Sequence, residues 1–195
     1  MKPEEDKSVQ EVRSVLHQFQ EGYARRDIAT LDAFMELFSS DSGIEIIGTG
    51  GLEPTKGEWC VGRAAVRKLI DNDWRFWGNL KLDEENARIT ILGEVAWLSA
   101  DATVTYEITA ERFYSDAIKE IQAVLERKDI PVKVKLTRIQ LEASEMIFET
   151  SRGDVYVWPL RCSAVLIKQN DLWCFHQIHF SHPTLRLPDA RLPII

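Results

Sequence analysis

Residues 156–182 read YVWPLRCSAVLIKQNDLWCFHQIHFSH, and the rest of the chain is organised around this stretch. Its two arms, residues 156–168 and 172–182, are rich in the β-branched, aromatic and aliphatic residues that favour strands. The residues between them, Gln169-Asn170-Asp171, suit a tight reversal because Asn and Asp hydrogen-bond locally and tolerate positive φ. The stretch predicts a β-hairpin. Neither face is plainly polar, so we expect a helix layer on one side and another subunit on the other.

Length and charge exclude several classes of protein. A chain of 195 residues fits one domain with a sizeable core. The net charge of -7 and the pI near 5.2 argue against nucleic-acid binding, which depends on Lys and Arg. The first residues are charged, and no apolar run is long enough to span a membrane, so we expect a cytoplasmic protein with no membrane partner. Three cysteines, Cys60, Cys162 and Cys174, lie in apolar runs and are expected to be buried, inert thiols.

The first half of the chain predicts helices followed by strands. Apolar residues recur at three- and four-residue steps from Val9 to Tyr23, which indicates an amphipathic helix, and Asp27 is placed to cap a second one. A strand then enters the glycine-rich residues 48–51. This piece has no Walker lysine and no dinucleotide fingerprint, so it is interpreted as a bend or bulge. A third helix is predicted to start at Gly62.

The second half predicts a meander with an insertion. Residues 80–92 and 95–108 read as antiparallel strands. Residues 109–151 have helical spacing interrupted at Pro131, which predicts an inserted helical hairpin with a role as lid, pocket wall or oligomer contact. Residues 183–195 contain three prolines and are expected to form an extended tail lying in a groove.

Two motifs carry a resemblance to a known family. The stretch GTGGLEPTKGEWCVG (residues 48–62) and the closing LWCFHQIHFSHP (residues 172–183) resemble the SnoaL-like branch of the nuclear transport factor 2-like superfamily, also called cystatin-like α+β cones. The order of predicted elements is similar too. The resemblance covers residues 9–108 and 155–182. This superfold hosts many unrelated activities, so the resemblance implies a fold more specifically than a function.

The resemblance implies an α+β fold in which three helices from the N-terminal half wrap a curved antiparallel sheet and leave a conical cavity. One domain would span residues 1–195, with the insertion at 109–151, and the outer sheet face would form a homodimer. Similarity to the association domain of calcium/calmodulin-dependent kinase II implies which residues of the last strand face the cavity. These are Cys174, His176, Ile178 and Phe180, which leaves Trp173, Phe175, Gln177 and His179 outside.

His176 is the first candidate for catalysis, because an imidazole among apolar neighbours is titratable near neutrality. A core histidine with one hydrogen bond is the alternative. Asp101 is the second candidate, as a cavity carboxylate, or else an exposed one. Ketosteroid-isomerase-like members hold a helix tyrosine and a strand carboxylate where this chain has Phe19 and Ile46, which argues against that chemistry. His176, His179 and His182 do not share one strand face, so no metal site is expected, and no cofactor is implied.

Apolar side chains, and aromatic side chains that carry a polar group, suit the wall of a ligand pocket. The predicted ligand-binding residues are Tyr23, Trp59, Trp77, Cys174, Ile178 and Phe180. The sequence therefore predicts a SnoaL-like protein of unassigned activity that binds a small apolar organic molecule in its cavity, with cofactor-free acid/base chemistry as a possible reaction. The alternative is a non-catalytic oligomerisation or adaptor module that uses the helical insertion and the tail.

Overall fold

A computed structural model describes residues 3–107, 110–150 and 155–182. Short 3-10 turns, Ile28–Thr30 and Met35–Leu37, flank the second helix. The predicted tail at residues 183–195 lies outside the described residues. The helices and strands, in chain order, are α1 (Pro3–Arg25), α2 (Leu31–Phe34), β1 (Glu45–Glu53), β2 (Lys56–Val61), α3 (Arg63–Phe76), β3 (Asn79–Leu82), β4 (Arg88–Leu92), β5 (Val95–Glu107), α4 (Ala110–Glu126), α5 (Val132–Thr150), β6 (Val155–Gln169) and β7 (Leu172–Ser181).

The chain divides into two compact units. The first consists of Met1–Val104 and Val157–Ile195, and the second is Thr105–Tyr156, which contains α4 and α5. The second unit corresponds to the predicted helical insertion. The prediction that the whole chain is one domain stays a prediction.

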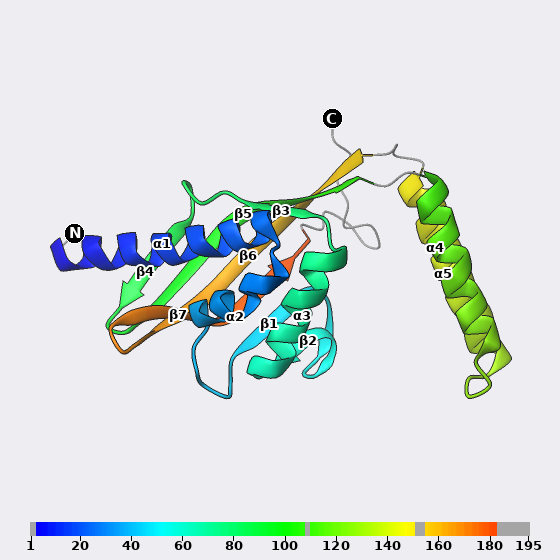
Figure 1. The fold of residues 1–195 in the computed structure, drawn as a ribbon, viewed down its shortest axis with the longest axis horizontal. Coiled ribbons are helices and arrows are strands. Elements are labelled where there is room, and N and C mark those ends of the chain that lie inside the picture. The colour runs from blue at the N-terminus through cyan, green and yellow to red at the C-terminus, as the bar shows by residue number, and fades with distance from the viewer. Residues whose placement is uncertain (1–2, 108–109, 151–154, 183–195) are drawn as a thin grey trace. The chain divides into compact units, whose positions relative to one another are not determined.

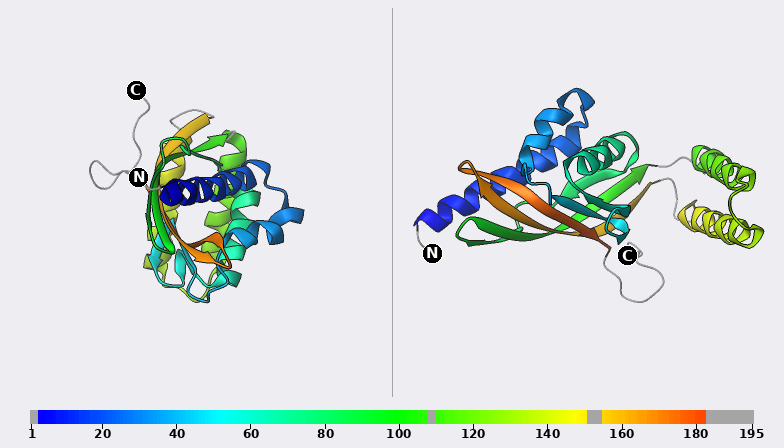
Figure 2. Two further views of the ribbon diagram at one scale, coloured as in Figure 1. Left: turned by 90° about the vertical axis from the view of Figure 1, so that its left-hand side faces the viewer. Right: turned by 90° about the horizontal axis from the view of Figure 1, so that it is seen from below.

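In the first unit, the described strands form one mixed sheet in the order β2-β1-β7-β6-β5-β3, with β4 also paired to β5. Helices α1, α2 and α3 lie on the same side of this sheet (Figures 1 and 2). The hairpin strands β6 and β7 are antiparallel, as are β1 with β2 and β4 with β5, whereas β1 and β7 run parallel. The predicted α+β cone is confirmed, and the parallel pairing is a feature that the sequence did not indicate.

The core lies between the three helices and the inner face of the sheet. The predicted stripe of α1 is buried at Val12, Leu16, Phe19 and Tyr23. Phe19 packs against Phe175 of β7, with ring centroids 5.3 Å apart. Each such side chain contributes about 1.5–3 kcal/mol when fully buried, so this contact between the first helix and the last strand is a major source of stability.

The predicted cap and turn residues act as expected. The Asp27 carboxylate accepts a hydrogen bond of 3.0 Å from the backbone N–H of Ala29, which ends α1 and starts the second helical segment. Asn170 and Asp171 have φ of 49° and 63°, so they turn the β6–β7 hairpin as their residue types predict. The register of β1 against β2 shifts on either side of Gly51, which confirms the predicted glycine-rich irregularity.

The predicted faces of β7 are wrong before His176, because that strand contains a β-bulge. Val165 of β6 pairs with Gln177, but the next residue, Leu166, pairs with Phe175, so His176 has no opposite residue. An extra residue in a strand exchanges the inward-facing and outward-facing positions of the residues that precede it. Trp173 and Phe175, predicted to lie outside, are therefore buried at 4% and 1% exposure. After the bulge, Ile178 and Phe180 face inward as predicted.

All three cysteines are free thiols. Cys162 and Cys174 are buried, while Cys60 is half-buried. Burial raises the pKa of the Cys162 thiol to about 12, so it stays protonated and unreactive at neutral pH. Within the described residues, no helix combines the length and the apolar character needed to cross a membrane.

Candidate ligand and proton-transfer site

A small hollow lies between α3 and the sheet, on the side of the sheet that the helices cover. One wall is the face of α3 that carries Leu69, Asp73 and Trp77 at steps of four residues. The remaining lining comes from three strands and consists of Ile46, Gly48, Thr49, Glu58 and Phe180. The hollow thus joins apolar and aromatic side chains to two carboxyl groups, a combination that suits a small ligand.

Tyr23 and Asp73 form the central polar pair of this site. The Tyr23 hydroxyl donates a hydrogen bond of 2.9 Å to Asp73 Oδ2. Tyr23 is fully buried on α1, with its ring 6.4 Å from that of Trp77. Burial and the neighbouring carboxylate raise the pKa of Tyr23 well above its usual value. The hydroxyl therefore stays protonated and acts as a donor to Asp73.

Asp73 is the group in this hollow most suited to proton transfer. Removal of its carboxyl group from water raises its pKa to about 7, and the charge of Glu58 raises it as well. The hydrogen bond from Tyr23 and the positive charge of Arg26 lower it, but they do not cancel the effect of burial. A carboxyl group that titrates near neutrality can both accept and donate a proton at physiological pH.

Arg26 fixes the geometry behind this pair. Its φ is 51°, which turns the chain sharply at the end of α1. Its guanidinium donates to the carbonyl oxygens of Trp77, at 2.6 Å, and of Gly78. The end of α1 is thereby tied to the end of α3, so Tyr23 and Asp73 are held in place by the backbone of both helices.

The glycine-rich start of the GTGG motif makes room for Glu58. A Cβ on Gly48 would lie only 2.5 Å from Glu58 Oε2 and 2.7 Å from Glu58 Cβ. The Glu58 carboxylate accepts a hydrogen bond of 2.8 Å from the backbone N–H of Gly50 and one of 3.4 Å from the Thr49 hydroxyl. Glycine at position 48 is therefore what lets a second carboxylate lie across β1 at the edge of the hollow.

The hollow is nearly filled in this conformation. Its volume is about 10 Å³, which is room for about one water molecule. A larger ligand therefore requires the side chains at the edge of the hollow to move. Trp77 is the C-cap residue of α3 with extended backbone, and Thr49 is exposed, so these residues lie where the hollow meets solvent.

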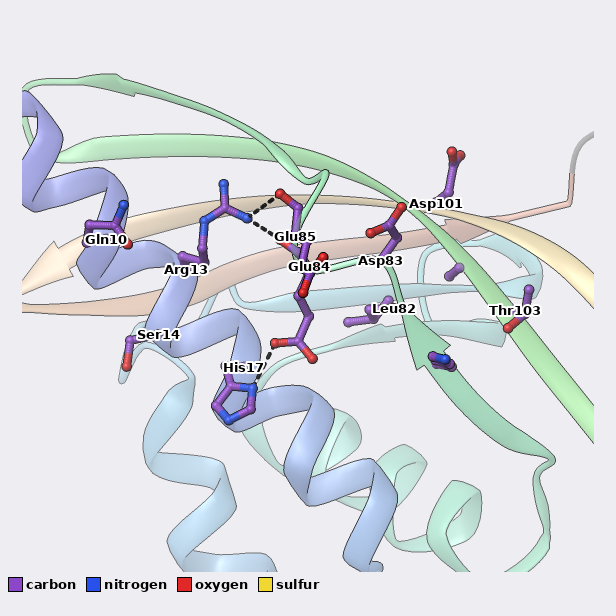
Figure 3. A pocket seen from close by; sticks show the side chains of 12 residues that line it. Gln10, Arg13, Ser14, His17, Leu82, Asp83, Glu84, Glu85, Asp101 and Thr103 are labelled. Carbon is purple, nitrogen blue, oxygen red and sulfur yellow. Dashed lines mark hydrogen bonds and ion pairs between the residues drawn. The ribbon is translucent and has the colours of Figure 1, made fainter. Parts of the chain in front are cut away.

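A larger, open groove of about 1040 Å³ lies elsewhere in the same unit, between α1 and the residues that follow β3 (Figure 3). Arg13 donates to the carbonyl oxygens of Glu84, Glu85 and Ala87, and His17 Nδ1 lies 2.8 Å from Glu84 Oε2. The His17 and Glu84 side chains therefore pair with each other, and the Arg13 guanidinium is held by backbone carbonyl groups. The groove joins α1 to the sheet edge, and ten of its twelve lining residues are polar or charged, with Leu82 and Ala102 as the apolar members.

The structure places the two predicted catalytic residues away from Asp73. Asp101 lines the open groove, is exposed, and points away from α1 in Figure 3. His176 is half-buried at the β7 bulge, where Nδ1 lies 3.3 Å from Ser39 Oγ. Ser39 is itself fully buried, and its N–H donates to the carbonyl of Phe175. Their catalytic roles stay predictions.

The predicted ligand-binding residues divide between the two faces of the sheet. Trp77 and Phe180 line the hollow, and Tyr23 contacts it through Asp73. Ile178 pairs with Ile46 of the lining, so it shares the inner face. The other two predicted residues, Trp59 and Cys174, lie on the outer face of the sheet.

Trp59 belongs to a polar cluster on the outer face. Its Nε1 donates a hydrogen bond of 2.7 Å to Glu45 Oε2, and Gln177 Nε2 donates to the other oxygen of the same carboxylate. Glu45 and Gln177 are directly opposite each other in the parallel β1–β7 pair. Cys174 also lies on the outer face, where it pairs with Ile167 of β6. The bulge at His176 places it there, because it reverses the face of the residues that precede it in β7.

Sequence reasoning missed Asp73 and Glu58. Asp73 follows Leu69 by four residues and precedes Trp77 by four, so it lies on the inward-packing face of the helix. An acidic residue at such a core position was the sequence signal for this site. The signal for Glu58 was its place opposite Gly48, which leaves space for one long side chain. Within the described residues, no group of His, Cys, Asp and Glu is arranged to hold a metal ion.

A curved sheet covered on one face by helices is the architecture of the cystatin-like α+β cone class. The sequence matches the model of the SnoaL-like domain over residues 12–116, more than half of the chain. The protein therefore belongs to the SnoaL-like domain family, which confirms the resemblance in its sequence. Among curated proteins, none matches the chain.

Solved structures share the fold at low sequence identity. An NTF2-like family protein of Streptomyces avermitilis, provisionally described as a dehydratase, is 12% identical with a TM-score of 0.58, covering 93% of this chain and 99% of that one. An NTF2-like protein of unknown function from Pseudomonas putida KT2440 is 11% identical with a TM-score of 0.58, covering 97% and 96%. An NTF2-like protein with a cystatin-like fold from Novosphingobium aromaticivorans is 14% identical with a TM-score of 0.55, covering 95% and 86%. At these identities the likeness concerns the fold alone.

Proposed function

We propose that this SnoaL-like protein binds a small, uncharged organic molecule in the inner hollow and exchanges a proton with it through Asp73. The observation that carries the proposal is the raised pKa of Asp73, about 7, at the wall of a hollow with aromatic lining. Titratable groups with strongly shifted pKa values that face a hollow are candidates for general acid/base catalysis.

The lining favours a neutral ligand over an anionic one. Asp73 and Glu58 would both repel an anion, and no Lys or Arg is among the described residues that line the hollow. Trp77, Phe180 and Leu69 offer apolar surface for a small body. A carbonyl or hydroxyl group could accept a proton from neutral Asp73, and a C–H next to a carbonyl could lose one to its carboxylate.

Cyclohexanone in D2O is a direct probe of this reaction, because exchange of its α-protons for deuterium needs only an acid and a base. We expect the protein to accelerate that exchange, measured by proton NMR, and expect the rate to fall at least tenfold in Asp73→Asn. Asp71→Asn is the matched control, since Asp71 lies on the same helix but pairs with Arg75 at the surface. Cyclohexanecarboxylate should not slow the reaction, since an anion is excluded.

Equal exchange rates with and without the protein would overturn the proposed chemistry. Native mass spectrometry of the purified protein would separately report a co-purified small molecule. Its presence, with no exchange activity, would support binding and reject catalysis.

The alternative, an oligomerisation module, is favoured by exposed apolar residues on the outer face of the sheet. On the outer face of β5, Val95 and Trp97 are 41% and 45% exposed, which supports the homodimer that the resemblance implies. We propose this face as a homodimer contact. Trp97→Glu should then lower the subunit number measured by sedimentation velocity, and an unchanged number would reject the contact.

A further inference from the structure

Helices α4 and α5 form an antiparallel hairpin (Figure 1). Part of its apolar surface is exposed. On α4, the half-buried row consists of Ala117, Ile121 and Val124, and on α5 the corresponding row contains Ile139 and Ala143. Residues spaced by three and four lie on one side of a helix, so these two rows face each other. They form the seam of the hairpin.

Further apolar residues lie beside the seam on each helix. On α4 they form a row of Tyr114, Ile118 and Leu125, which are 43%, 54% and 54% exposed. On α5 the corresponding position is held by Leu136, which is 62% exposed. Val132, seven residues before Ile139, continues the seam and is 71% exposed at the first residue of the helix. Leu136 and the α4 row are displaced from the seam in the same rotational sense. In two antiparallel right-handed helices, such positions point to the same side, so they form one continuous surface, here called the hairpin apolar face.

The two sides of the hairpin differ in charge. The side opposite the hairpin apolar face carries Asp116, Lys119 and Glu120 on α4, and Lys135 and Arg138 on α5. An ion pair of 2.7 Å joins Lys119 to Asp116 there, and Lys135 Nζ donates to the carbonyl of Leu125 at 2.6 Å. This is the pattern of a solvated surface.

The border of the hairpin apolar face is polar but mostly uncharged. Helical spacing places the following exposed residues along it: Glu111, Ser115 and Gln122 on α4, and Lys133, Thr137, Gln140 and Ser144 on α5. An apolar centre with a neutral polar rim is the composition of a protein–protein contact rather than of a solvated face. One Glu on the α4 border and one Lys on the α5 border leave no excess charge to repel an identical surface.

We infer that the hairpin apolar face is the contact with a second copy of this chain, in which two hairpins pack into a four-helix bundle. A two-fold axis along the hairpin places α4 of one copy over α5 of the other, so the acid-bearing border meets the base-bearing one. Two-fold contacts are self-complementary, and the bundle is the arrangement in which two such hairpins bury their open sides.

The size of the face fits this partner. A helix of 17 residues is about 26 Å long, and two helices side by side are roughly 20 Å wide, so pairing two faces removes on the order of 1,000 Å² from water. That is the lower end for a specific contact between proteins. A hairpin of about 40 residues is also below the size at which a helical unit usually sustains its own core, so pairing supplies the missing burial.

The test compares Ile118→Asp and Leu136→Asp with Ala123→Asp, in the full-length protein, by sedimentation velocity and light scattering. We expect each of the first two variants to show about half the subunit number of the wild type at a loading concentration above the wild-type dissociation constant and below that of the variant. The dissociation constant should rise on the order of 30-fold, as expected for a central contact residue. Ala123 is exposed on the same helix, away from the apolar face, so its variant introduces the same charge and should leave association unchanged.

The halving is measured relative to the wild type, so it identifies the hairpin contact whether or not the sheet face also associates. A wild type that is monomeric at high concentration would overturn the inference. So would an Ile118→Asp or Leu136→Asp variant that keeps the wild-type subunit number. Far-ultraviolet circular dichroism checks that the helices are retained, and Ile118→Ser, which adds no charge, should weaken association in the same direction if an aspartate variant unfolds.

Discussion

Tyr23 donates a 2.9 Å hydrogen bond to Asp73, and this contact links the first helix to the third beside a hollow that combines aromatic walls with a carboxyl group titrating near neutrality. The tyrosine is a hydrogen-bond donor that favours the charged form of Asp73, whereas burial favours the neutral form. The opposition of these two effects leaves both protonation states available near pH 7.

Replacement of Asp73 by Asn should make the fold less sensitive to pH. The folded pKa of Asp73, about 7, lies above its ordinary value of 3.8, so the folded state binds the proton more tightly than the unfolded state. The stabilisation from that proton is therefore present at low pH and is lost as the pH rises from about 4 to 7. The asparagine side chain of the variant keeps a neutral acceptor for Tyr23 at every pH.

Asp73→Asn should consequently be more stable than the wild type at pH 8 by about 4 kcal/mol, or roughly 8–16 °C in Tm, and nearly equal to it at pH 4. Thermal unfolding followed by circular dichroism across this range measures the difference. Asp71→Asn serves as the control, and it should show no such gain at alkaline pH. A variant less stable than the wild type at pH 8 would contradict the assignment of a buried, charged Asp73.

Tyr23→Phe should move the Asp73 titration to higher pH. The variant keeps the aromatic packing but removes the hydroxyl, and that hydrogen bond lowers the pKa of Asp73 in the wild type. NMR titration of the ¹³C-labelled aspartate carboxyl groups reports the change. Loss of the donor should also cost about 1–3 kcal/mol above neutral pH, where the carboxylate is charged. An unmoved titration would mean that the hydroxyl does not act on Asp73.

Gly48→Ala should displace Glu58 and destabilise the protein by about 1–3 kcal/mol, because the new methyl group would overlap the Cβ of Glu58, which cannot swing away. Urea unfolding measures the loss. With Glu58 pushed outward, the pKa of Asp73 should also fall, since the charge of Glu58 raises it. Gly50→Ala is the comparison: its Cβ would approach only the end of the Glu58 side chain, at 3.3 Å, so it should cost less.

The spacing of apolar residues predicted the helices and strands, because that spacing reflects which face of each element is buried. The α1 stripe, the Asp27 cap, the alternation in β5 and the β6–β7 turn each arise from residues close together in the chain, and the structure has all of them. The bulge at His176 has no such local signal. It exists because Phe175 must reach Phe19 and Phe38 while Phe180 reaches Trp77, and strict alternation cannot place Phe175 and Phe180 on one face.

The candidate site was predictable only in part for the same reason. Tyr23 and Trp77 were predicted because aromatic residues that carry a polar group suit a pocket wall, and Phe180 because the resemblance to the kinase association domain places it on the cavity face. Asp73 was overlooked because an acid on a helix is usually solvated, and its neighbour Asp71 is indeed paired with Arg75 at the surface. Only the packing of α1 against α3 distinguishes the two, since it places Tyr23 beside one carboxylate and leaves the other outside.

Arg13→Met should loosen the segment after β3 and leave the rest of the first unit intact. The guanidinium donates to three carbonyl oxygens in residues 84–87, and methionine keeps the apolar stem but no donor. Amide hydrogen exchange in residues 83–87 should become faster, and the free energy of unfolding should fall by about 1–3 kcal/mol. Arg25→Met, which removes only a surface pair with Glu21, should change stability by less than about 0.5 kcal/mol. Equal effects of the two substitutions would contradict the role given to Arg13.

Phe175→Ala is the sharpest test of the bulge. If β7 alternated strictly, Phe175 would share the outer face with Gln177 and its truncation would cost little. With the bulge, its ring is buried between Phe19 and Phe38, at centroid distances of 5.3 and 5.7 Å, so truncation should cost about 3–5 kcal/mol. Leu172→Ala is the control from the same strand, because Leu172 is 69% exposed and should lose less than about 0.5 kcal/mol. Urea unfolding of both variants measures the contrast, and a Phe175→Ala variant as stable as Leu172→Ala would place residues 172–175 on the opposite face and remove the bulge.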